Sequence, residues 1–169
     1  DKDLTMDELI RACRTNFEGQ ERIRQLLLNK PEKYGNDLEH VNGIYREMMQ
    51  FVANTVQGWR DARGGWYAFG IDSQTMNIPH GEVTGALPDG RPAGEPFCDA
   101  ASPMMGRDRN GPTATVKSVA GIGQDNLHEG ALFNLRFDPK GVQGERGLNI
   151  IEGVIRTFFE NGGEHIQIN

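Results

Sequence analysis

The strongest constraint on the fold is a run of side chains that recurs every three or four residues from Leu38 to Trp59. This spacing is that of one face of an α-helix, and it continues for about six turns. We therefore expect a long helix that begins near Asp37, with this face packed in a core. The side chains of the face are Leu38, Val41, Ile44, Tyr45, Met48, Val52, Thr55, Val56 and Trp59.

Two shorter helices are predicted before the long one. Thr5 and Glu8 have the spacing of a capping box, in which the hydroxyl and the carboxylate each bind a backbone N–H at a helix start. Apolar residues at helical spacing follow as far as Phe17, and Gly19 is expected to end this helix. A second short helix is expected around Ile23.

The sequence after Arg60 is rich in Gly, Pro and Asp and has little helical period. Strands are expected at 66–69, 113–119, 132–137 and 164–169, and a helix at 148–160. The order strand, strand, helix, strand at the end of the chain favours an α/β fold with a helix against a sheet. We divide the chain into a helical part, 1–62, and a loop-rich part with the strands, 63–169.

Composition excludes some classes of function. The net charge of −6, with basic and acidic residues interleaved, argues against nucleic acid as a partner. No apolar run approaches the roughly 20 residues that span a bilayer, and the first residues are too polar for a signal peptide. Cys13 and Cys98 are too few for a disulfide framework, so a reduced, cytoplasmic setting is expected.

The segment from Gly90 to Gly111 is irregular, with several Gly, Pro and charged residues. Such a segment is either a solvated linker or a binding loop held by a scaffold. Because exposed methionines are unfavourable, the pair Met104-Met105 indicates that this loop packs inward.

Other candidate chemistry is weak. The chain has no nucleotide-binding glycine motif and no Gly-x-Ser-x-Gly elbow, and its four histidines lie far apart. They do not have the spacing of metal ligands, so we expect no metal site. Cys98 lies in the inward-packing loop, where two interpretations stay open, a thiyl or thiolate role and a small buried side chain, and the second is the simpler. Cys13 on an apolar helical face is expected in a core.

A block of motifs between Pro88 and Ala120 resembles the glycyl radical enzyme family of pyruvate formate-lyase-like proteins. The motifs are Pro88-Asp89-Gly90-Arg91, Ala93-Gly94-Glu95-Pro96, Asp99, Ser102-Pro103, Gly106-Arg107-Asp108, Gly111-Pro112-Thr113-Ala114 and Lys117-Ser118-Val119-Ala120. Further resemblance lies in Lys33-Tyr34-Gly35-Asn36-Asp37, in Arg63-Gly64-Gly65 and in the last eight residues, Gly162 to Asn169. The resemblance therefore covers nearly the whole chain.

The resemblance implies a fold and a mechanism. The fold is part of a ten-stranded α/β barrel made of two half-barrels, with 1–169 as a partial domain truncated at both ends. In the family, an activase that uses S-adenosylmethionine and an iron–sulfur cluster makes a backbone glycyl radical. This radical oxidises a cysteine to a thiyl, which takes a hydrogen atom from a small organic substrate. The full-length protein is expected to be a homodimer.

The sequence departs from the family pattern at both radical positions. Neither Cys13 nor Cys98 has a Glu two residues further on, and no Arg-Val-x-Gly-Tyr motif is present. We therefore assign no catalytic residue and no bound cofactor to these residues, and we expect the thiyl cysteine and the radical glycine to lie outside the chain. This part of the protein alone is expected to be inactive.

The resemblance also implies a substrate loop, the segment from Ser102 to Arg107. The candidate pocket residues are Ser102, Met104, Met105 and Arg107. A methionine contact favours a less polar substrate, such as an arylacetate or a hydrocarbon adduct, over glycerol or choline.

Three functions stay open. The first is radical cleavage of a C–C, C–O or C–N bond by a lyase, dehydratase or decarboxylase. The second is a catalytically empty module of the same fold, and the third is a formate C-acetyltransferase. The Gly111-Pro112-Thr113-Ala114 and His165-Ile166-Gln167 patterns favour the dehydratase/decarboxylase branch over true pyruvate formate-lyase. No motif supports an unrelated α/β hydrolase.

Overall fold

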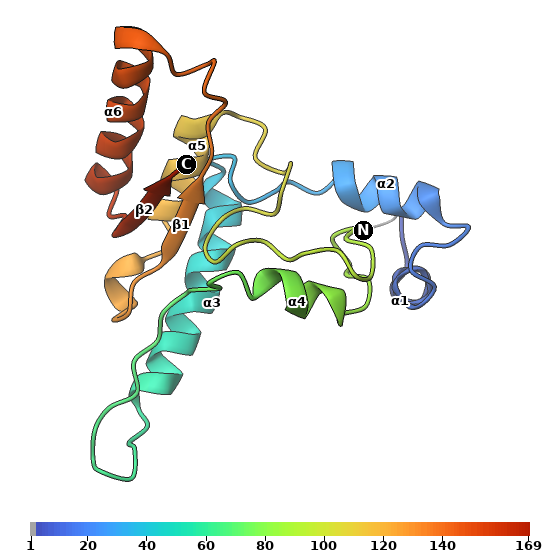
Figure 1. Ribbon diagram of the computed structural model, residues 1–169. Helices are drawn as coiled ribbons and strands as arrows, with labels where there is room; N and C mark the ends of the chain where they lie inside the picture. The colour runs from blue at the N-terminus through green and yellow to red at the C-terminus, as the bar shows by residue number, and fades with distance from the viewer. Residues whose placement is uncertain (1–2) are drawn as a thin grey trace. The chain divides into compact units, whose positions relative to one another are not determined.

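Figure 1 shows the computed structural model, in which residues 3–169 are described. The elements are α1 (Met6–Arg14), α2 (Glu21–Asn29), α3 (Glu39–Gln57), α4 (Asn77–Glu82), α5 (Pro112–Ala120), the 3-10 turn η1 (Gln124–Asn126), β1 (Leu132–Leu135), α6 (Gly144–Glu160) and β2 (His165–Ile168). They form two compact units, which among the described residues are 3–32 with 75–97 and 33–74 with 98–169. Each unit therefore combines segments from both predicted parts, 1–62 and 63–169.

The first unit holds α1, α2 and α4. The capping box of α1 is confirmed: the Thr5 N–H donates to Glu8 Oε2 at 2.8 Å, and the Glu8 N–H donates to Thr5 Oγ1 at 3.3 Å. The helix ends at Arg14, earlier than the predicted end at Gly19, because Asn16 and Phe17 take left-handed φ angles of 51° and 62°. The core of this unit contains Ala12, Phe17 and Leu27.

Arg91 is buried in the first unit, where it organises the Pro-Asp-Gly-Arg turn. Its guanidinium donates to the carbonyl oxygens of Pro92 at 2.7 Å and of Thr84 and Gly85 at 3.3 Å. Its Cζ atom lies 4.4 Å from the centroid of the Phe97 ring, a cation–π distance. The conspicuous arginine of the motif therefore has a structural role in the described residues.

The second unit is built around two parallel strands. β1 pairs with β2 in the register Leu132↔His165 to Leu135↔Ile168, and α6 is the crossover helix between them. In Figure 1, α5 and α6 lie beside this small sheet. Phe133 of β1 packs on Phe158 of α6 with ring centroids 5.8 Å apart, and both side chains are buried. The predictions of strands at 132–137 and 164–169 and of the helix at 148–160 are confirmed, with small shifts of the bounds.

Two predicted strands are wrong. Residues 113–119 form most of helix α5, although they alternate and include β-branched residues. Pro112 fits the first helical position, and Gly111 takes the φ of 85° that the preceding turn needs. Both faces of this helix are buried, so tertiary packing outweighs the strand preference. Residues 66–69 form only an isolated bridge between Trp66 and Arg60.

The long helix is confirmed as α3, but its predicted core face is partly wrong. Of the predicted face, Ile44 is 69% exposed, and Met48 and Trp59 are also exposed. The buried residues of α3 are Asn42, Met49 and Ala53, and Tyr45 packs against the core of the second unit. The described residues therefore cover only a narrow stripe of this helix and leave its most apolar stripe open. No helix among residues 3–169 is long and apolar enough to span a membrane.

Two glycines, one within α6 and one just after it, give a test of stability. An added Cβ at Gly163 would collide with the Phe158 ring, whereas at Gly153, in the middle of α6, it would meet nothing within 4 Å. We expect Gly163→Ala to cost about 1–3 kcal/mol of unfolding free energy by overpacking. Gly153→Ala should stabilise the protein by up to about 1 kcal/mol through helix propensity. Urea unfolding of the two variants measures both effects, and equal midpoints would contradict the Phe158 contact.

Candidate functional site

The two-stranded sheet has one apolar face and one polar face. Successive side chains of a strand point to opposite faces, and paired residues of neighbouring strands share a face. Phe133 and Leu135 are buried and Ile166 packs against them, on the side of the core that α5 and α6 complete. The other face carries Asn134 and Gln167, which are register partners, together with Leu132 and His165.

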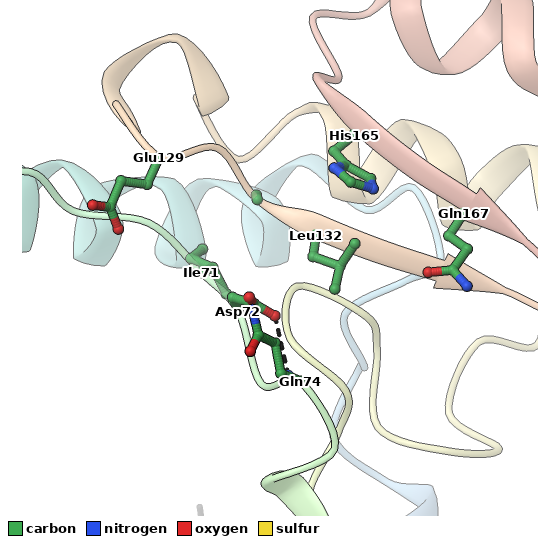
Figure 2. A pocket seen from close by; sticks show the side chains of 8 residues that line it. Ile71, Asp72, Gln74, Glu129, Leu132, His165 and Gln167 are labelled. Carbon is green, nitrogen blue, oxygen red and sulfur yellow. Dashed lines mark hydrogen bonds between the residues drawn. The ribbon is translucent and has the colours of Figure 1, made fainter.

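An open pocket of about 280 Å³ lies on this second face. Figure 2 shows His165 and Gln167 on β2 and Leu132 on β1, with the loop of Ile71, Asp72 and Gln74 beside them. The pocket is lined by Ile71, Asp72, Gln74, Glu129, Ala131, Leu132, His165 and Gln167. All of these residues belong to the second unit.

The loop of Ile71 to Gln74 is joined to the free edge of β1. The Leu132 N–H donates to the Ile71 carbonyl at 2.9 Å, and the Ile71 N–H donates to the Gly130 carbonyl at 3.0 Å. The loop then turns sharply: the Gln74 N–H donates to Asp72 Oδ1 at 3.1 Å, and Gln74 has a φ of 40°. A left-handed φ in a residue other than Gly stores backbone strain, which is common next to functional sites.

A second segment, 99–102, joins the same edge of β1. The Ala101 N–H donates to the Leu132 carbonyl at 3.0 Å, and the Ser102 hydroxyl lies within hydrogen-bond distance of the Asn134 N–H and carbonyl, at 3.3 and 3.4 Å. The Asp99 carboxylate accepts from the Asn134 side-chain amide at 2.5 Å and from the Ser73 hydroxyl. The segment that leads into the predicted substrate loop is therefore fixed to the sheet.

The chemistry of the lining suits a substrate with hydroxyl or N–H groups. Asp72 and Glu129 offer carboxylate acceptors, Gln74 and Gln167 offer amides that both donate and accept, and His165 adds an imidazole. Neither Lys nor Arg is among the lining residues. Among residues 3–169, no group of three or more His, Cys, Asp or Glu side chains is arranged to hold a metal ion.

Two stacked tyrosines lie under the segment 99–102. The rings of Tyr34 and Tyr45 are 4.7 Å apart and nearly parallel, at 7°. The Tyr34 hydroxyl donates to the Ala101 carbonyl at 3.2 Å. Burial, followed by the charge of the neighbouring Tyr45, raises the pKa of Tyr34 well above its usual value. Burial and the nearby Cys98 thiol raise the pKa of Tyr45 to about 12.

The four residues predicted from the sequence do not line this pocket. Ser102 is attached to β1 and Met104 is half-buried, whereas Met105 is 62% exposed, so the expectation that it packs inward is wrong here. Arg107 is half-buried, and its Nε atom is buried without a hydrogen-bond partner. None of the four is among the residues that line the 280 Å³ pocket. Their assignment to a substrate pocket stays a prediction.

Sequence reasoning missed the residues that do line the pocket. His165 and Gln167 are two residues apart in a predicted strand, so the alternation of a strand places both side chains on one face. This shared face is a sequence signal for two of the lining residues. The loop residues Asp72 and Gln74 have no comparable signal, because their position depends on the pairing of Ile71 with the distant Leu132.

Comparison with family profiles gives two matches. The profile described as "Pyruvate formate lyase-like" matches residues 1–81, and the profile described as "Glycine radical" matches residues 97–169. Among curated proteins, the chain is 41% identical to a trans-4-hydroxy-L-proline dehydratase of Clostridioides difficile and 38% identical to an isethionate sulfite-lyase of Bilophila wadsworthia. The matches cover 99% and 100% of the chain, which spans about a fifth of the length of these relatives, 21% and 20%.

Solved structures agree with this result. The hydroxyproline dehydratase of Clostridioides difficile with bound trans-4-hydroxy-L-proline matches with a TM-score of 0.94 at 40% identity, over 99% of the chain and 21% of that structure. The glycerol-bound, B12-independent glycerol dehydratase of Clostridium butyricum matches with a TM-score of 0.93 at 35% identity, over 100% of the chain and 21% of that structure. The described fold is therefore a small part of the barrel of these enzymes.

The tyrosine stack predicts a loss of stability at high pH. Above the ordinary tyrosine pKa of about 10, the unfolded chain releases phenolic protons that the folded chain keeps. The contribution of the raised Tyr45 pKa to the free energy of unfolding is therefore fully present below about pH 10, and it decreases as the pH rises towards 12. We expect a loss of about 1 kcal/mol per buried ring between pH 9 and pH 11 in urea unfolding. Tyr45→Phe should reduce this slope, and an unchanged slope would contradict the assignment.

Proposed function

The chain belongs to the glycyl radical enzyme family, and we propose that it forms one wall of the substrate chamber of a radical dehydratase or lyase. The observation that supports this role is the two-faced sheet, whose apolar face is covered by α5 and α6 while its polar face is open at the pocket. A barrel places helices outside and substrate inside, so the polar face is the side that a substrate would meet.

The wall would have two tasks. Radical intermediates need an enclosed chamber that excludes water and oxidants, and the packed side of the sheet, with Phe133 and Phe158, provides a dense barrier. The polar side would orient the substrate through Asp72, Gln74 and Gln167, so that one C–H bond faces the thiyl sulfur.

In this proposal the radical chemistry comes from residues outside 1–169. A glycyl radical, installed by an activase that uses S-adenosylmethionine and an iron–sulfur cluster, takes a hydrogen atom from a cysteine. The resulting thiyl would take a hydrogen atom from a substrate carbon. The leaving group would then depart from the neighbouring carbon with the bonding electron pair and a proton, as water does in a dehydration. The thiol would return a hydrogen atom to the product radical and so regenerate the thiyl. Neither Cys13 nor Cys98 has the sequence context of that cysteine, so neither receives the role.

The polar lining supports a small substrate with hydroxyl or amine groups. This differs from the less polar substrate that Met104 and Met105 suggest, and neither methionine is among the residues that line the pocket. The named relatives, a hydroxyproline dehydratase and a sulfite-lyase, support dehydratase or lyase chemistry over the alternative of a formate C-acetyltransferase. A homodimer in the cytoplasm, with the activase as its partner, completes the proposal.

The proposal is tested with the full-length protein that contains this sequence. Anaerobic treatment with the activase, S-adenosylmethionine and a reductant should produce the electron paramagnetic resonance signal of a glycyl radical. A panel of hydroxylated compounds, including diols and hydroxyproline, should then give a dehydrated or cleaved product. We expect Gln167→Leu to lower kcat/KM by about 10- to 100-fold through a lost substrate hydrogen bond, with the radical yield unchanged.

Glu152→Gln is the matched control. Glu152 Oε1 lies 2.8 Å from Arg156 Nη2 on an exposed turn of α6. An exposed ion pair of this kind contributes little to stability. This variant should keep full activity. Absence of any radical would favour the catalytically empty module, and a radical with unchanged kinetics in Gln167→Leu would remove the pocket from the substrate site.

A further inference from the structure

Asp99 connects the two segments that border the pocket. One carboxylate oxygen, Oδ1, accepts from the Ser73 hydroxyl, and the other, Oδ2, accepts from the Asn134 amide at 2.5 Å. Ser73 lies between the lining residues Asp72 and Gln74, and Asn134 is the register partner of the lining residue Gln167. A single side chain therefore links the pocket loop to the pocket face of the sheet.

The carboxylate is held on a fixed backbone. The Asp99 carbonyl accepts from the Ser102 N–H at 2.9 Å, which closes a turn in which Ala100 has a left-handed φ of 47°. Ala101 is fully buried, and its N–H and carbonyl are bound by Leu132 and by the Tyr34 hydroxyl. Because its carbonyl and the residues that follow it are bound in this way, Asp99 provides an anchored carboxylate for a partner.

The pocket loop has few other attachments. Within residues 71–74, the hydrogen bonds to the rest of the described chain are the two backbone bonds of Ile71 and the Ser73–Asp99 bond. Ile71 fixes only the start of the loop. The strained turn at Gln74, with its φ of 40°, needs a tether beyond Ile71 to hold its shape.

We infer that Asp99 is a positioning residue, which holds Asp72 and Gln74 at the pocket by fixing Ser73 to Asn134. Asp99 does not line the pocket itself and would act on a substrate only through the loop. The consequence for catalysis rests on the proposed function, whereas the tether itself is a property of this chain.

The first experiment tests the link from Ser73 through Asp99 to Asn134, called the tether here, and it needs no measurement of enzymatic activity. Hydrogen–deuterium exchange of the peptide that covers residues 71–75 should be about 10- to 100-fold faster in Ser73→Ala and in Asp99→Ala than in the wild type. Ser73→Thr keeps the hydroxyl donor and should restore slow exchange. If Asp99→Ala does not fold, the two Ser73 variants decide the question alone.

Ser118→Ala is the matched control. The Ser118 hydroxyl is buried and accepts from the Asp37 N–H at 2.8 Å, far along the chain from the loop. This variant should lose stability but leave exchange at 71–75 unchanged. The inference would be overturned if residues 71–75 of Ser73→Ala exchanged as slowly as in the wild type. It would also be overturned if Ser118→Ala accelerated their exchange as much as Ser73→Ala does.

The second experiment uses the activated full-length enzyme. Ser73→Ala should raise KM by about tenfold or more, with the radical yield unchanged and Ser73→Thr close to the wild type. Absence of turnover in the wild type would refute the proposed function and leave the exchange result standing. Accelerated exchange with unchanged KM would show that the tether exists without serving the substrate.

Discussion

Strand β1 is the constraint on which the rest of the second unit depends. It has only four residues, yet both of its edges form hydrogen bonds and both of its faces contact other parts of the unit. One edge pairs with β2, and the other receives Ile71 and Ala101. One face packs through Phe133 on the helices, and the other carries Asn134 towards the pocket. A shift of β1 by one residue would exchange the two faces, which would bury the amide and expose the ring.

The sequence predicted the elements whose signals are local. The capping box at Thr5, the long period of α3 and the helix α6 all depend on neighbours within one or two turns. The segment 113–119 was misread because its β-branched residues indicate a strand, while burial on both sides keeps it helical. The exposed Ile44 and Trp59 show the limit of periodicity, which identifies an apolar face but not the surface that covers it.

The site was only partly predictable for a related reason. Family motifs pointed to the loop from Ser102 to Arg107, and the structure shows how its first residue is fixed to β1. The pocket itself forms where Asp72, Leu132 and His165 meet, and these residues are separated by long stretches of sequence. Such a meeting depends on strand pairing and on side-chain hydrogen bonds, neither of which leaves a pattern in a single sequence.

The parallel pairing of β1 with β2 also fixes the order of events during synthesis. The two strands cannot meet until the whole of α6 has been made, because a parallel pair needs a crossover between its strands. On a translating ribosome, α3 and the loop at Ile71 emerge long before His165 does. Until His165 to Ile168 have been made, the edge of β1 that pairs with β2 stays open, even though Ile71 and Ala101 can already bind its other edge.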